Sequence, residues 1–248
     1  GGGGRGGGGE GGAWAGGRGG ARWTGAGIGA APVAKRERRK ALGARRIPVP
    51  YDAAWKALEE RTYPGAEGTF IHPFDDHNFI VGHATMGLEI FEDAPETAAV
   101  IAAIGGGGLL AGVGGALKAL KPGIKVWSAE PETAAPTARS FALGSPQKFG
   151  EWKASFVDGA GGQSVFPRMW ERMRPLLDGC IVVTLDETRR AMRLMAEKIR
   201  VIAEGAGALP LAAALTGKAG QGPIVAIVSG GNIDLQKFFE LIASVEPA

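Results

Sequence analysis

The apolar run TAAVIAAI, at residues 97–104, is followed directly by four glycines at 105–108. An apolar run without polar alternation is typical of a strand that helices cover on both faces, as in a parallel sheet. Two further runs, CIVV at 180–183 and PIVAIV at 223–228, have the same character. The chain is therefore expected to contain a buried parallel sheet, with the glycine run as the turn after one of its strands.

Segments with a helical period separate these strands. Tyr51, Ala54, Trp55 and Leu58 follow the spacing of one helix face, which predicts an amphipathic helix over 51–63. The other expected helices lie at 76–92, 107–120, 186–200 and from Leu235 to Ile242, and the other expected strands lie at 69–72 and 125–129. A capping box, Thr184 with Glu187, opens the helix at 186–200. This alternation predicts an α/β protein made of parallel βαβ units, which bind ligands at the carboxyl ends of their strands.

Charge is concentrated at one end of the chain. Residues 1–50 hold ten Lys and Arg against two Glu, whereas residues 51–248 hold 18 basic and 23 acidic side chains. The remainder of the chain is therefore acidic and offers no basic face of the kind that nucleic acid requires. A single cysteine, Cys180, excludes a disulfide framework. No apolar stretch suits a membrane span or a signal peptide, so we expect a cytoplasmic protein with no nucleic-acid or membrane partner.

Residues 1–30 contain 17 of the 43 glycines and show no apolar periodicity. Such a segment loses much backbone entropy on ordering and has few side chains to offset that loss. We expect a low-complexity or corrupted segment, which a frameshift, a fragment or glycines standing for unidentified residues would each explain. An RNA-binding tail is a distant alternative, because only Arg5 and Arg18 suit Arg-Gly-Gly repeats and only Trp14 and Trp23 could stack on bases.

The glycines at 105–108 stand between an apolar strand and a helix. Glycine in this place lets the backbone turn tightly and present N–H groups to an anion, and the helix N-terminus adds a partial positive charge. Close packing of strand on helix is the alternative role, and the run does not match the G-x-G-x-x-G dinucleotide pattern. SGGNID at 229–234 follows the apolar run 223–228 in the same way, with helix capping by Asn232 or Asp234 as the alternative. Two such turns in one sheet favour a flat, phosphorylated ligand.

Seven ordered motifs extend this interpretation beyond the two turns. They are IHPFDD (71–76), GHATMGLEI (82–90), IGGGGLLAG (104–112), AEPE (129–132), SFVDGAGG (155–162), AEGAGALPLAAAL (203–215) and SGGNID (229–234). In this order and spacing, residues 31–248 resemble the pyridoxal-phosphate enzymes of the serine/threonine dehydratase type, which include serine racemases. The resemblance implies fold type II, with a parallel or mixed sheet flanked by helices, and pyridoxal 5'-phosphate as cofactor.

The resemblance also implies a set of cofactor-binding residues. Gly105, Gly106, Gly107 and Gly108, with the amide of Leu109, would cradle the phosphate. Ser229 would hydrogen-bond the pyridine nitrogen, Glu204 would lie beside the ring, and Gly159 would line the cleft. A neutral hydroxyl at the ring nitrogen favours β-elimination.

The implied reaction converts a small β-hydroxy amino acid to a 2-oxo acid and ammonia, in an enzyme that is commonly a homodimer. Serine racemisation, hydroxyaspartate ammonia-lyase activity and a non-catalytic chain that binds phosphate or pyridoxal phosphate are the alternatives.

The sequence departs from the family at its catalytic residue. The family's Schiff-base lysine stands in a Ser-Phe-Lys-x-Arg-Gly-type motif, and no lysine here has that context; Lys35, the first, begins the run KRERRKALGA. The family's Ser-x-Gly-Asn-His loop is also absent, and Gly82-His83-Ala84-Thr85 replaces a frequent Gly-Gln-Gly-Thr. Because the lysine serves as imine anchor and base, no catalytic residue is assigned, and the chain as written is expected to be inactive.

Two further expectations concern domains and metal. We expect a glycine-rich segment at 1–30, a remnant of a small domain at 31–75 and a large cofactor-binding domain at 76–248. Some relatives bind a divalent cation through residues that correspond to Glu130, Ala134 and Pro136. Proline has no side-chain ligand, which puts the cation in doubt. The histidines, which are His72, His77 and His83, show no metal-binding spacing and are expected to be structural.

Overall fold

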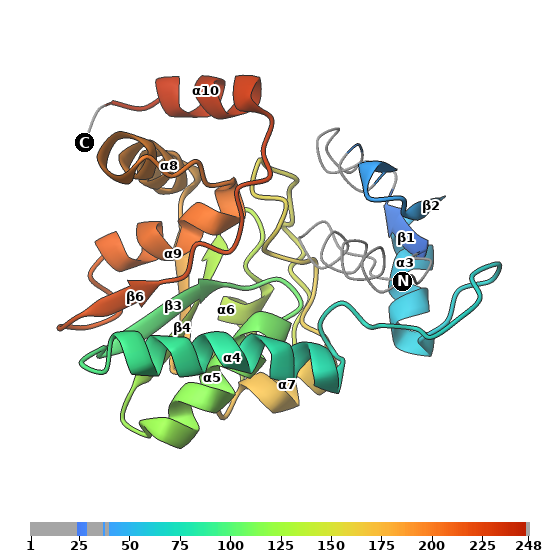
Figure 1. Cartoon of the computed structure of the whole chain (residues 1–248), viewed down its shortest axis with the longest axis horizontal. Coiled ribbons are helices and arrows are strands. Elements are labelled where there is room, and N and C mark those ends of the chain that lie inside the picture. Colours follow the sequence, from blue (N-terminus) through green and yellow to red (C-terminus); the bar gives the residue numbers. More distant parts are fainter. Residues whose placement is uncertain (1–23, 29–36, 38–39, 247–248) are drawn as a thin grey trace.

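The structure is a computed structural model and describes residues 24–28, 37 and 40–246 (Figure 1). The expectations for residues 1–23 and for Lys35 lie outside the described residues. No described helix combines the length and the apolar character that crossing a membrane requires.

A four-stranded sheet forms the centre of the chain. Its strands are β3 (Ala99–Ala103), β4 (Lys125–Pro131), β5 (Gly179–Val183) and β6 (Ile224–Ala226). They lie in the order β5-β4-β3-β6, and each neighbouring pair is parallel. The predicted α/β class with a parallel sheet is thus confirmed.

Helices cover this sheet on both faces, as Figure 1 shows. They are α4 (His77–Asp93), α5 (Gly108–Leu120), α6 (Pro136–Leu143), α7 (Pro167–Met173), α8 (Leu185–Ile199), α9 (Gly205–Leu215) and α10 (Leu235–Ala243). Successive residues of β3 face opposite ways: Ile101 belongs to the core formed with α8, α9 and α10, and Val100 to the core formed with α4, α5 and α7. Every residue of β3 is buried, which explains its unbroken apolar sequence.

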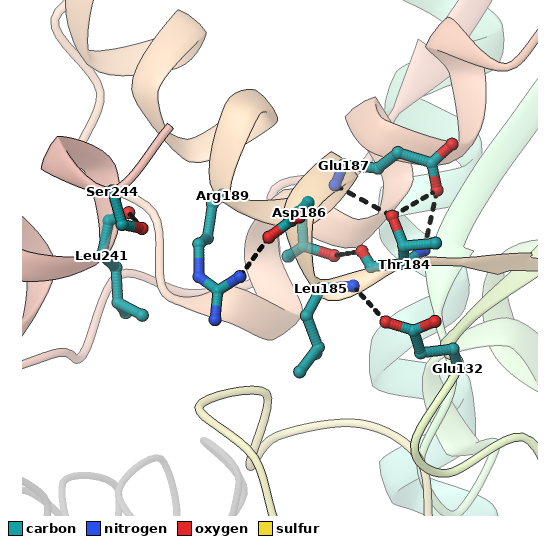
Figure 2. A network of polar contacts seen from close by, with 9 residues as sticks. Glu132, Thr184, Leu185, Asp186, Glu187, Arg189, Leu241 and Ser244 are labelled. Atoms are coloured by element: carbon teal, nitrogen blue, oxygen red, sulfur yellow. Dashed lines mark hydrogen bonds and ion pairs between the residues drawn. The ribbon is translucent and has the colours of Figure 1, made fainter. Parts of the chain in front are cut away.

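The predicted capping box opens α8. The hydroxyl of Thr184 accepts the N–H of Glu187 at 3.1 Å, and the Glu187 carboxylate accepts the N–H of Thr184 at 2.7 Å (Figure 2). Glu132, just after β4, accepts the N–H of Leu185 at 2.9 Å. The first turn of α8 is therefore tied to the carboxyl end of the neighbouring strand.

A second, two-stranded sheet precedes the large one. Strand β1 (Thr24–Ile28) pairs in parallel with β2 (Arg45–Val49), and α3 (Tyr51–Glu60) follows. Figure 1 places these elements to one side of the central sheet. An edge-to-face contact between Trp55 of α3 and Phe166, with ring centroids 5.7 Å apart, joins the two parts.

Three sequence expectations need correction. Residues 69–72 are not a strand, because the chain turns immediately after them and finds no partner strand among the residues described. Strand β6 is half-buried rather than buried on both faces, since it lies at the sheet edge. Helices α6, α7 and α9 lie outside the predicted elements, and α9 is so apolar all round that it has no amphipathic period.

Candidate functional site

The two glycine turns lie side by side at the carboxyl end of the sheet. Strand β3, which precedes Gly105, pairs directly with β6, which precedes Ser229. The N–H of Ile227 extends this pairing by donating to the carbonyl of Ile101 at 3.0 Å. A ligand lying across the ends of these two strands would therefore contact both turns.

The tetraglycine leads into α5 with its N–H groups available. Gly107 is the N-cap residue, with φ of 90°, and Gly105 is exposed. Within the described part of the chain, no group accepts a hydrogen bond from the N–H of Gly105, Gly106 or Gly107. Free N–H groups together with the positive end of α5 fit a phosphate.

The opposite side of the tetraglycine is filled by side chains. A Cβ on Gly106 would collide with the ring of Phe74, and one on Gly107 with the sulfur of Met173. On Gly108 it would lie 2.8 Å from the carbonyl oxygen of Phe74. Glycine is therefore required by packing at Gly106, Gly107 and Gly108 and also by φ at Gly107, which supports the packing role considered from the sequence. The sequence did not single out Phe74 or Met173 as site residues, although Phe74 lies in the recognised motif IHPFDD.

Glu204 lies between two other glycines of the site. It is the N-cap residue of α9, and its N–H donates to the carbonyl of Gly230 at 3.1 Å. Its Oε1 would be 2.5 Å from a Cβ on Gly230 and 3.5 Å from one on Gly159. Three predicted residues, Gly159, Glu204 and exposed Ser229, are thus gathered next to the tetraglycine, since a Cβ on Gly105 would lie 3.3 Å from the carbonyl of Gly159.

These groups fit both ends of pyridoxal phosphate. The N–H groups of the tetraglycine suit the phosphate, and the turn at Ser229 supplies a hydroxyl for the ring nitrogen. Three of the lysines lie elsewhere: Lys118 and Lys125 bind Asp178, and Lys121 binds the carbonyls of Pro95 and Thr97. These contacts are at the amino ends of β3 and β4, away from the glycine turns.

The residues expected at a cation site do not fit one. Both carboxylate oxygens of Glu130 accept the N–H of Thr137, at 3.0 and 3.1 Å, and one also accepts that of Ala138 at 3.0 Å. Glu130 therefore caps α6 instead of facing a metal. The carbonyl of Ala134 lies against Gly161, and Pro136 offers no side-chain ligand. No cluster of three or more metal-binding side chains occurs among the residues described.

Burial dominates the electrostatics of Glu130. It raises the pKa of the carboxyl to about 7, although the N–H groups of Ala138 and Thr137 oppose the shift. The thiol of Cys180 donates to Glu130 at 3.4 Å, and burial raises the pKa of that thiol as well. Cys180 is thus a structural neighbour of Glu130, with its reactivity as a thiolate suppressed.

Comparison with known proteins points in one direction. A family model described as "Pyridoxal-phosphate dependent enzyme" matches residues 4–230. An L-threonine ammonia-lyase of Thermotoga maritima is 35% identical over 218 residues, which cover 86% of this chain and 53% of that protein. A catabolic L-threonine dehydratase of Escherichia coli K12 is 38% identical over 181 residues, or 71% of this chain and 55% of the relative. The chain therefore spans about half the length of these relatives.

Solved structures agree with the sequence relatives. A threonine deaminase from T.th. is 32% identical with a TM-score of 0.78, and the match covers 91% of this chain and 74% of that one. Maize serine racemase is 31% identical with a TM-score of 0.80, covering 94% and 72% respectively.

Proposed function

This chain belongs to the pyridoxal-phosphate dependent enzymes of fold type II, and we propose that it is part of an L-threonine or L-serine ammonia-lyase. The proposed reaction converts the amino acid to a 2-oxo acid and ammonia. The observation that carries the proposal is the pairing of β3 with β6, which sets the tetraglycine beside Ser229 and Glu204.

Each group has a role in holding the cofactor. The N–H groups of Gly105 to Leu109 bind the phosphate, and Gly159 leaves room for the ring beside Glu204. Ser229 would donate a hydrogen bond from its hydroxyl to the pyridine nitrogen. Because a neutral hydroxyl keeps its proton, that nitrogen would stay unprotonated, which favours loss of a β-hydroxyl. When bound, the cofactor supplies the electron sink that acidifies the α-carbon of the substrate.

Serine racemisation is the second candidate. The similarity to maize serine racemase supports it, and hydroxyaspartate ammonia-lyase activity remains a further alternative within the family. The names of the two sequence relatives favour the lyase.

We further propose that the chain of 248 residues binds its cofactor without a covalent bond and is inactive by itself. The support is the absence of any lysine in the family's motif context. Strand β2 and helix α3 support a small-domain remnant at 31–75 before a large domain at 76–248, but the partner strand β1, at Thr24–Ile28, lies within the segment proposed as glycine-rich at 1–30. From the resemblance to the family, we also propose that the protein forms a homodimer and is located in the cytoplasm.

The test is a pair of titrations on the purified chain, one with pyridoxal phosphate and one with inorganic phosphate. Gly105→Asp is expected to weaken both ligands by at least about tenfold, because it adds a negative charge at the open end of the loop. Gly123→Asp is the control: that glycine is exposed like Gly105, lies in the turn before β4 and has open space, whereas a Cβ on Gly105 would lie 3.3 Å from the carbonyl of Gly159. Ser229→Ala is expected to weaken pyridoxal phosphate alone.

Several outcomes would contradict the proposal. Equal affinity of the Gly105→Asp and Gly123→Asp variants would reject the tetraglycine as the phosphate site. A covalent cofactor adduct, detected by mass after borohydride reduction, would reject non-covalent binding, and 2-oxo acid formed from L-threonine would reject inactivity.

A further inference from the structure

His72 organises the turn that carries Phe74. It is fully buried, and its Nδ1 accepts the N–H of Asp75 at 2.9 Å and the N–H of Phe74 at 3.3 Å. Accepting at Nδ1 places the ring proton of neutral histidine on Nε2. The imidazole meets the Phe74 ring edge-on, with centroids 4.4 Å apart. One side chain therefore fixes both the backbone and the ring of Phe74.

Arginines hold the same turn from the outside. The carboxylate of Asp75 is 1% exposed, and Arg61 donates to it at 2.8 Å and to the Asp75 carbonyl at 2.7 Å. Arg168 and Arg172, both on α7, approach the carboxylate at 3.5 and 3.4 Å. The turn is thus clamped between the end of α3 and the helix that also supplies Met173.

Phe74 forms the floor of the phosphate loop. Its ring occupies the space beside Gly106, and its carbonyl and Cα lie 2.8 and 2.9 Å from the position of a Cβ on Gly108. These distances to an added Cβ show that Phe74 fills the space on the Cβ side of Gly106 and Gly108, so the loop backbone packs against it. Displacement of Phe74 is therefore expected to shift the loop backbone, and with it the directions of the loop N–H groups.

We propose that His72 is a positioning residue for the phosphate loop, which holds Phe74 beneath Gly106 and Gly108 and so keeps the loop N–H groups directed at one anion. That this anion is the cofactor phosphate rests on the proposed function. Burial, followed by the charge of Arg61, lowers the pKa of His72 to about 4, so the Nδ1 acceptor is present at neutral pH.

Two substitutions of His72 distinguish the effect of its Nδ1 hydrogen-bond acceptor from the effect of the volume of its ring. In His72→Asn the side-chain oxygen can replace Nδ1, because asparagine accepts N–H groups two and three residues ahead in turns. His72→Leu fills similar space with no acceptor. We expect His72→Leu to weaken pyridoxal phosphate and inorganic phosphate by about tenfold and His72→Asn to remain within about threefold of the parent chain. Equal losses in the two variants, or no loss in His72→Leu, would overturn the proposal.

A second pair of variants covers the case in which His72→Leu does not fold. Phe74→Leu removes the ring beneath the loop, and Phe141→Leu removes a half-buried ring from the same hydrophobic core, where it packs on Trp170. Only Phe74→Leu should weaken both ligands. Equal affinity of the two leucine variants would overturn the proposal.

Amide hydrogen exchange gives a readout that needs no ligand. The N–H of Ala111 donates to the carbonyl of Gly107 at 2.9 Å and so reports the loop conformation. We expect His72→Leu or Phe74→Leu to speed its exchange, and His72→Asn and Phe141→Leu to leave it near that of the parent. If the parent chain binds no pyridoxal phosphate but exchange responds in this way, the proposed function fails and the positioning role stands. Unchanged exchange in both His72→Leu and Phe74→Leu overturns the positioning role.

Discussion

The backbone N–H of Glu204 donates to the carbonyl oxygen of Gly230 at 3.1 Å, and the Glu204 carboxylate occupies the space beside that glycine. This contact ties the start of α9 to the turn that carries Ser229. The Glu204 side chain can therefore lie beside the proposed ring site only because residue 230 is a glycine and has no side chain of its own.

Gly230→Ala is expected to weaken pyridoxal phosphate binding by about tenfold while leaving inorganic phosphate binding unchanged. The new methyl group would lie 2.5 Å from Oε1 of Glu204, so the carboxylate, which is proposed to lie beside the ring, would have to move. Titration of the two ligands measures the difference. Gly150→Ala is the control, since that glycine has open space around it. Equal weakening of both ligands by Gly230→Ala would show that the effect is not confined to the ring.

Replacing either of two glycines of α5 by alanine should change the free energy of unfolding, but in opposite directions. A Cβ on Gly112 would meet the carbonyl of Ile80 and would lie 2.7 Å from the Cβ of His83, so Gly112→Ala should lower the free energy of unfolding by about 2 kcal/mol or more. Gly115 has open space, and Gly115→Ala should raise that free energy by about 0.5–1 kcal/mol. Urea unfolding measures both. The close α4–α5 packing would be contradicted if Gly112→Ala were as stable as Gly115→Ala.

Much of the fold could be predicted because local pattern and tertiary environment agree. The run before Gly105 is apolar on both faces because β3 is central and covered on both sides. The capping box at Thr184 is a local interaction and needs no tertiary information. Residues 69–72 have the composition of a strand, but pairing requires a partner that the sequence does not reveal. Similarly, the edge position of β6 depends on strand order, which is a tertiary property.

The site was predictable where its parts follow strands. The turns at Gly105 and Ser229 could be assigned because the carboxyl ends of adjacent parallel strands share one edge. Phe74 and Met173 could not, because they reach the loop from segments that are distant from it in the sequence, one on each side. The capping role of Glu130 depends on where α6 begins, which the sequence motif alone does not give.

The titration of His72 should make stability depend on pH. Its pKa is about 4 in the fold, below the ordinary value of 6.5, so the unfolded chain binds the proton more readily. The charged groups that act on it are Arg61, Asp75, Asp76 and Arg168. The stability that neutral His72 contributes should therefore be complete above about pH 6.5. As the pH drops toward 4, the free energy of unfolding should fall by up to about 3 kcal/mol.

Unfolding at a series of pH values in the parent and in His72→Asn isolates this contribution, because asparagine does not titrate. The difference between their free energies of unfolding should change between pH 6.5 and 4 and be constant above about pH 7. A constant difference over the whole range would contradict the assignment of the acceptor to a neutral His72.

The use of Glu130 as a helix cap predicts that the fold does not depend on a divalent cation. Its carboxylate is fully buried and already accepts the N–H groups of Thr137 and Ala138. The thermal midpoint of the chain should be the same with Mg²⁺, with Ca²⁺ and with a chelator. Glu130→Ala should lower the free energy of unfolding by about 3 kcal/mol, because it leaves buried N–H groups without an acceptor, and Glu130→Gln should cost less.

Glu132→Ala is the matched control for Glu130, since Glu132 also caps a helix but is exposed. It accepts the N–H of Leu185 at 2.9 Å, and its loss should cost about 1 kcal/mol or less. A rise in the thermal midpoint on adding either cation, lost in Glu130→Gln but kept in Glu132→Ala, would show that Glu130 binds metal after all.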